Sequence, residues 1–134
     1  MRGLLKEELR MYKNSANAYE LYRQNDVYTS SQGKLLLMLY DGAIKFLGRS
    51  RLYIDNKNYQ EANRNIIKAE NILTELMCTL NMDYQLSENL FGLYDYLKQR
   101  LIEANIKKDN KAVGEVLDML IDLRNTWQSA IASL

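Results

Sequence analysis

The 134-residue sequence has no histidine, no proline, a single cysteine and no apolar run close to a membrane span in length. Without histidine, the chain lacks the commonest general base near neutral pH and the commonest transition-metal ligand. Without proline, nothing in the chain forbids long helices. The lone Cys78 cannot form an internal disulfide, and we interpret it as a packed small hydrophobe. These absences argue against an enzyme, a metal site and membrane insertion, and they favour the cytoplasm.

The charges are nearly balanced, with 18 Lys and Arg against 17 Asp and Glu, which gives a net charge of +1. Such a chain exerts no general electrostatic attraction on nucleic acid. The six glycines do not form a phosphate-binding loop, and no other cofactor motif is present. Composition therefore predicts a globular protein with no nucleic-acid partner and no cofactor.

Apolar residues recur at helical spacing in four segments, and the alternation typical of strands is absent. The inward rows that this spacing predicts are Leu36, Tyr40, Ala43, Leu47 and Ile54; Ala62, Ile66, Ala69, Leu73, Leu76 and Leu80; Leu90, Leu93, Tyr94, Leu97, Leu101 and Ala104; and Val113, Val116, Leu117, Leu120, Leu123, Trp127 and Ile131. Four long helices with short links predict an all-α fold, an antiparallel up-down four-helix bundle over residues 29–134.

Polar residues at the expected starts of these helices can accept hydrogen bonds from their first free amides. The candidate caps are Thr29, Ser30 and Ser31 for the first helix, with Ser31 the best placed, Asn58 with Glu61 in a capping box for the second, Ser87 for the third, and Asp109 or Asn110 for the fourth. Each lies within a few residues of an apolar row, so the links between helices are predicted to be short.

Residues 1–28 differ from the rest of the chain and are predicted to form a short, partly mobile helical arm. Turn-favouring residues at 14–17 and 25–26 interrupt its apolar pattern. Tyr19 and Tyr22 are two of several tyrosines in it, and an aromatic ring with a polar tip suits a surface that is alternately buried and wet. The arm is therefore either a reversible lid or a permanent anchor. Met1 and Met11 are both candidate starts of the chain.

Several apolar residues fall outside the inward rows. Leu37 and Ile44 form a stripe with Tyr40 and Leu47 at the edge of the first helix, and Ile67 flanks the inward face of the second. Aligned apolar residues outside a core indicate a surface that something covers. That cover is either the arm or a second copy in a homodimer, or it is an amphipathic or extended segment of a partner protein.

Six short blocks, in order, resemble the flagellin export chaperones of the FliS type. The blocks are residues 17–19 with Tyr22, 37–43 (LMLYDGA), 66–69 with 73–76, 93–96, 100–105 and 123–127. The resemblance implies a cytoplasmic chaperone that binds the disordered C-terminal segment of flagellin, prevents its premature polymerisation and keeps it competent for flagellar secretion. It also leaves room for contact with the flagellar export apparatus.

The resemblance also suggests which residues take part. Tyr19 and Tyr22 would form the lid, and the candidate groove or support residues are Leu36, Leu37, Tyr40, Ile44, Leu47, Ile67, Leu123 and Trp127. The alternative function is a self-associating structural or regulatory adaptor that uses the same surplus apolar surface.

Overall fold

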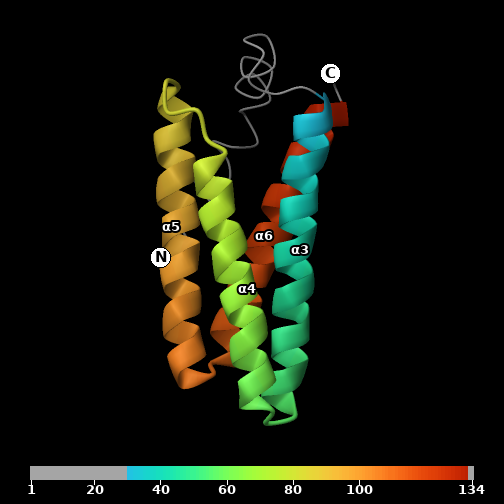
Figure 1. Cartoon of the computed structure of the whole chain (residues 1–134), viewed down its shortest axis with the longest axis vertical. Coiled ribbons are helices and arrows are strands. Elements are labelled where there is room, and N and C mark those ends of the chain that lie inside the picture. Colours follow the sequence, from blue (N-terminus) through green and yellow to red (C-terminus); the bar gives the residue numbers. More distant parts are fainter. Residues whose placement is uncertain (1–29, 133–134) are drawn as a thin grey trace.

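The structure, a computed structural model, describes residues 30–132 and shows a four-helix bundle (Figure 1). The helices are α3 Ser30–Asp55, α4 Tyr59–Cys78, α5 Gln85–Lys107 and α6 Asn110–Ala132. Short connections join them, and no strand occurs in this part of the chain. The predicted all-α fold is therefore confirmed. The predictions made for Tyr19, Tyr22 and the rest of the arm lie outside the described residues.

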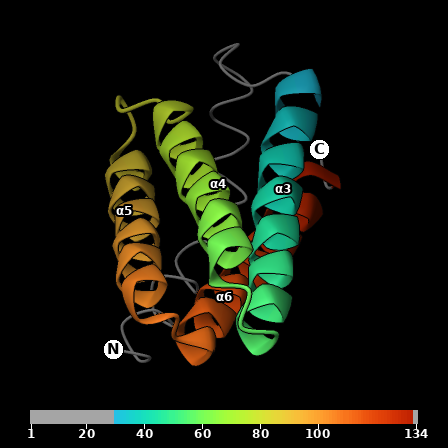
Figure 2. The same ribbon diagram turned by 60° about the horizontal axis from the view of Figure 1, so that its bottom comes forward.

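The four helices alternate in direction, as an up-down bundle requires (Figures 1 and 2). α3 packs on α4 and α6, α4 packs on α5, and α5 packs on α6. Both views show α6 starting beside the end of α5 and finishing beside the start of α3. Because of this oblique path, α6 packs more extensively on α3 than on α5.

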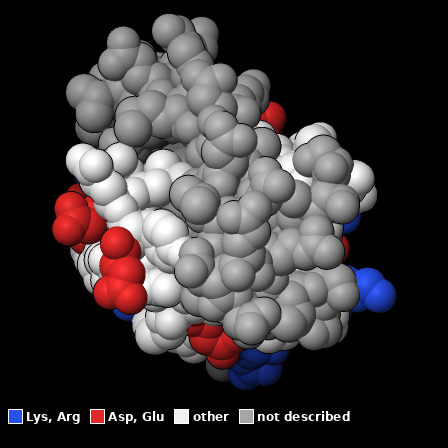
Figure 3. Space-filling model, turned by 90° about the horizontal axis from the view of Figure 1, so that it is seen from above, with Lys and Arg blue, Asp and Glu red and all other residues white. Residues whose placement is uncertain are grey.

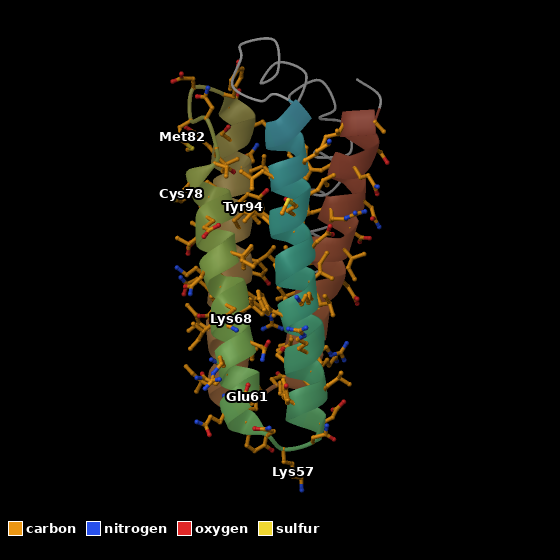
Figure 4. The ribbon with its side chains drawn as sticks, turned by 45° about the vertical axis from the view of Figure 1, so that its right-hand side comes forward. Lys57, Glu61, Lys68, Cys78, Met82 and Tyr94 are labelled. Atoms are coloured by element: carbon orange, nitrogen blue, oxygen red, sulfur yellow. The ribbon has the colours of Figure 1, made fainter. Side chains whose placement is uncertain are left out.

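The predicted inward rows form the core, apart from a few end and edge positions. Two tyrosines, Tyr40 of α3 and Tyr94 of α5, are completely buried, and their hydroxyl groups share a hydrogen bond across the bundle. Figure 4 shows Tyr94 among the side chains between the helices. Buried hydroxyls need partners, so this pair fixes how α3 and α5 face one another. Leu80, Leu117 and Ile131, which were predicted to face inward, are only partly buried.

Two predicted caps are confirmed. The Asn58 side-chain oxygen accepts a hydrogen bond from the Glu61 amide at 3.4 Å, although the Asn58 amide itself donates to the Tyr53 carbonyl instead of completing a capping box. At α6, Asp109 is the cap, because its carboxylate accepts from the Ala112 amide at 3.2 Å. Asn110 is the first residue of the helix.

Two other predicted caps are wrong. Ser31 lies inside α3, which already begins at Ser30, because no proline in this segment stops the helix from extending. α5 begins two residues before Ser87, after an extended Tyr84. The buried Ser87 hydroxyl donates back to the Asn81 carbonyl and so ties down the preceding turn.

Cys78 is exposed, so the interpretation of this residue as a packed hydrophobe is wrong. It is the last residue of α4 and lies on its outer side, away from the row that ends at Leu76.

At the opposite end of the bundle, Lys57 takes a positive φ of 59° in the turn between α3 and α4 (Figure 4).

Candidate partner-binding site

Two polar contacts fix the side of α3 that faces α6. The Arg124 Nε lies 2.9 Å from an Asp41 carboxylate oxygen, and the Arg51 Nε donates to the Asn110 side-chain oxygen at 2.8 Å. Residues three, four or seven positions apart lie on the same side of a helix. Leu37, Ile44 and Gly48 have this spacing from Asp41 or Arg51, so they also lie on the side of α3 next to α6.

The same reasoning places Leu117 and Ile121 on the facing side of α6. Leu117 follows Gly114 by three residues and precedes Arg124 by seven. Ile121 follows Gly114 by seven residues and precedes Arg124 by three. Gly114 marks this side because a Cβ atom there would come within 2.8 Å of the Arg51 guanidinium. Leu117 is partly buried against the core, and Ile121 is exposed.

We call this surface the α3–α6 edge. It consists of Leu37, Ile44 and Gly48 of α3 and Leu117 and Ile121 of α6. Leu37 and Ile44 are partly buried against the core, as their position outside the inward row predicted. Leu117 was predicted to face inward, because its spacing is close to that of the true core row, and it lies instead on this edge.

Gly42 and Gly48, two of the glycines of α3, have different surroundings. A Cβ at Gly42 would meet the Ile72 side chain at 3.2 Å, so Gly42 allows α3 and α4 to pack closely. A Cβ at Gly48 would have no neighbouring atom within 4 Å. A helix-interior glycine costs roughly 0.5–1 kcal/mol relative to alanine, and the packing of the described chain does not require it at position 48. Gly48 therefore leaves room on the α3–α6 edge for the close approach of another backbone.

Five of the predicted site residues lie in the core and not on this surface. Leu36, Tyr40, Leu47, Leu123 and Trp127 are each no more than 7% exposed. They belong to α3 and α6, the two helices whose facing sides form the α3–α6 edge. As groove or support residues they remain predictions, and in the core they expose little surface to a partner.

Ile67 lies elsewhere, on the α4–α5 edge. This second surface is fixed by the Asn105 amide, which donates to the Asn63 side-chain oxygen at 2.7 Å. Ile67 follows Asn63 by four residues, and Ile102 precedes Asn105 by three. The structure therefore brings Leu37 and Ile44 together on one edge but places Ile67 on another.

The α4–α5 edge also carries a charged group that is half-buried. Burial raises the pKa of the Glu70 carboxyl, and the positive charge of Lys98 partly opposes that shift. Between α5 and α6, Arg100 pairs with Glu115 at 3.1 Å, and this hydrogen bond raises the pKa of the guanidinium. Neither arrangement pairs a nucleophile with a base.

Charged side chains of both signs lie around the rim of the molecule when it is viewed from the end where α3 begins (Figure 3). Within residues 30–132, no three His, Cys, Asp or Glu side chains are grouped as metal ligands would be. No helix in that range has the length and apolar character needed to cross a bilayer. In the part of the chain that the structure describes, a partly exposed apolar surface is thus the feature that points to a function.

Comparison with known families agrees with the resemblance noted in the sequence. Residues 15–134 match the family model of the flagellar protein FliS. The chain belongs to the FliS family. This family membership covers the whole bundle, including both edges described above, and the relatives reported below are named as flagellar secretion chaperones.

Several characterised relatives are similar over most of their length. The flagellar secretion chaperone FliS of Bacillus subtilis is 43% identical over 117 residues, which cover 87% of this chain and 88% of the relative. The FliS chaperone of Escherichia coli is 32% identical over 113 residues, covering 82% and 83%. That of Salmonella typhimurium is 32% identical over 108 residues, covering 78% and 80%.

Proposed function

We propose that the protein is a cytoplasmic chaperone that holds the disordered C-terminal segment of flagellin on the α3–α6 edge. Flagellin would then be unable to polymerise before export, and it would reach the flagellar export apparatus unfolded. The observation that carries this proposal is the apolar α3–α6 edge, found on a bundle whose relatives are flagellar secretion chaperones. Binding of this kind requires no cofactor and no catalytic group.

Four apolar side chains on this edge can act as anchors for a client segment: Leu37, Ile44, Leu117 and Ile121. Complete burial of such a side chain contributes at most about 1.5–3 kcal/mol. Ordering a disordered segment typically costs about 2–5 kcal/mol. Two or three anchors are therefore enough to offset the ordering cost, while Gly48 allows the client backbone to come close.

We further propose that the arm covers the same edge when no client is bound, with Tyr19 and Tyr22 as its contacts. A reversible cover competes with the client, so the double variant Tyr19→Ser/Tyr22→Ser is expected to bind the client several-fold more tightly. A permanent anchor would instead lower the thermal stability of the double variant and leave the affinity unchanged. Calorimetric titration and a melting curve on the same samples distinguish the two.

The function itself is tested by titrating the protein with full-length monomeric flagellin and with flagellin lacking its C-terminal segment. We expect saturable binding to the first protein only, together with delayed filament assembly in a light-scattering assay. Equal binding to both forms of flagellin would refute the assignment of the client segment.

Sedimentation of the chain alone tests the alternative function. A stable homodimer that takes up no flagellin would support a self-associating adaptor and contradict the chaperone proposal. A monomer that becomes a one-to-one complex on adding flagellin is the expected result.

A further inference from the structure

α3 carries a second surface on its exposed side next to α4, separate from the α3–α6 edge. Its residues follow one another at alternating steps of three and four positions: Leu35, Met38, Gly42, Lys45, Arg49 and Leu52. We call this row the α3 seam. Met38 is 68% exposed and Leu52 is 64% exposed, and Leu35, Lys45 and Arg49 are exposed as well. Alternating steps of three and four are the spacing with which one helix packs along another.

The charge of the α3 seam is positive at its centre. Lys45 and Arg49 lie between the apolar residues of its two ends. On the neighbouring helix, Lys68 extends the positive region, since the ammonium groups of Lys45 and Lys68 both lie over the Phe46 ring, at 5.8 and 5.2 Å from its centroid. Asp41 is the only acidic residue of α3 before Asp55, and Arg124 holds it on the other flank of the helix.

We propose that the α3 seam docks an acidic amphipathic helix of a partner protein, with apolar side chains at both ends of its contact row and Asp or Glu at the centre. The carboxylates would lie against Lys45 and Arg49, and the apolar ends against Met38 and Leu52. The row from Leu35 to Leu52 spans about 26 Å, which corresponds to a partner helix of roughly five turns. Because the seam lies about a third of a turn around α3 from Ile44, this partner and flagellin can bind together.

Two other occupants fit the α3 seam less well. A second copy docked seam to seam would place the like charges of Lys45 and Arg49 close together, which disfavours pairing. Helices that lie on a membrane separate their charged residues from their apolar ones on different faces. In the α3 seam, both kinds of residue lie on one face, with the apolar residues at the ends of the row and the basic residues at its centre.

The probe for this proposal is a fluorescein-labelled helical peptide of about 21 residues, with Leu at the two ends of its contact row and Glu at the centre. A matched control peptide carries Lys in place of each Glu. Fluorescence anisotropy with the full chain is expected to give at least about tenfold tighter binding to the acidic peptide, and a preference that weakens as salt is added.

Two variants complete the experiment. Lys45→Glu/Arg49→Glu is expected to reverse the preference between the peptides, and Met38→Glu/Leu52→Glu to abolish binding of both. Circular dichroism checks that each variant stays helical, as the exposure of these side chains predicts. Because the seam is separate from the α3–α6 edge, both variants should bind flagellin with unchanged affinity.

Three outcomes overturn the proposal. The first is equal affinity for the two peptides, or no saturable binding of either. The second is binding to phosphatidylglycerol vesicles without binding to the acidic peptide, which would assign the seam to a membrane surface. The third is a dimer of the wild-type chain that Met38→Glu/Leu52→Glu dissociates, which would assign it to a second copy.

Discussion

The α3–α6 edge and the α4–α5 edge of the bundle both carry isoleucines that the core leaves partly uncovered. Ile44 and Ile121 lie on the first edge, and Ile67 and Ile102 lie on the second. On the α4–α5 edge, the isoleucines are flanked by the Asn63 and Asn105 hydrogen bond and by the charges of Glu70 and Lys98. The same residue type therefore offers a partner a different surface on each edge, depending on which polar groups lie beside the apolar residues.

The α3–α6 edge is bordered by the hydrogen bond from Arg51 to Asn110, and its apolar row is crossed by the ion pair of Asp41 with Arg124. This pair is partly exposed, and such pairs contribute only about 0–1 kcal/mol to stability. It can therefore be rearranged by a client at little cost. The edge also contains Gly48, whose missing side chain leaves open space beside Ile44.

The largest expected effect comes from placing an aspartate on the α3–α6 edge. The same change on the α4–α5 edge serves as its control. Ile44→Asp should weaken binding of the flagellin C-terminal segment by about tenfold or more, because it removes an anchor worth about 1.5–3 kcal/mol and desolvates a carboxylate. Ile67→Asp should change the affinity by less than about twofold. Calorimetric titration measures both variants, and circular dichroism confirms that both are folded. Equal losses would erase the distinction between the edges.

Tyr40→Phe tests whether the core beneath the α3–α6 edge contacts the client. Removing one hydroxyl leaves that of Tyr94 without this hydrogen bond, so the free energy of unfolding should fall by about 1–2 kcal/mol. Urea denaturation measures that loss. The affinity for flagellin should stay the same, because Tyr40 is completely buried. A loss of affinity at unchanged stability would move Tyr40 from support to direct contact.

A pair of glycine variants tests the space on the edge with a smaller effect. Gly48→Ala and Gly92→Ala both add a Cβ to a helix where no atom lies within 4 Å, so each should stabilise the protein by about 0.5–1 kcal/mol. Only Gly48→Ala should weaken flagellin binding, by a few-fold, since Gly92 is on α5. The proposed close approach at Gly48 is wrong if the two variants bind flagellin equally well.

The smallest expected effect is on the pH dependence of the free energy of unfolding, to which Glu70 on the α4–α5 edge contributes. The raised pKa of Glu70 means that the folded chain holds this proton more tightly than the unfolded chain does. Stability from this group is therefore greatest in acid and falls as the pH rises from the ordinary value of 4.5 through the raised folded value. Glu70→Gln should flatten that part of the profile. Urea denaturation across this pH range would contradict the account if the slope were the same in both proteins.

Much of the fold could be predicted from the sequence, because helical spacing directly reports which residues face a common core. The core row from Leu90 to Ala104 and the cap at Asn58 follow from local pattern alone. Ser31 and Ser87 could not be assigned correctly, because a cap depends on where the chain turns and not only on residue type. The turn before α5 uses Ser87 to hold the Asn81 carbonyl.

The candidate site could be predicted only in part. A helical wheel identifies Leu37, Ile44 and Ile67 as lying outside their inward rows, but it does not say which helices are neighbours. Contacts between residues far apart in sequence, such as Asp41 with Arg124, decide that Ile44 faces α6. The hydrogen bond from Asn105 to Asn63 puts Ile67 on the other side of the bundle. Such pairings depend on the packed fold, which local spacing does not encode.

Photo-crosslinking tests most directly the claim that flagellin lies on the α3–α6 edge. A benzoylphenylalanine is placed at Ile121 in one variant and at Ile102 in another, and each is irradiated with the flagellin C-terminal segment. The account predicts a crosslinked product from position 121 and none above background from position 102. Crosslinking from position 102 alone would contradict it and would place the client on the α4–α5 edge.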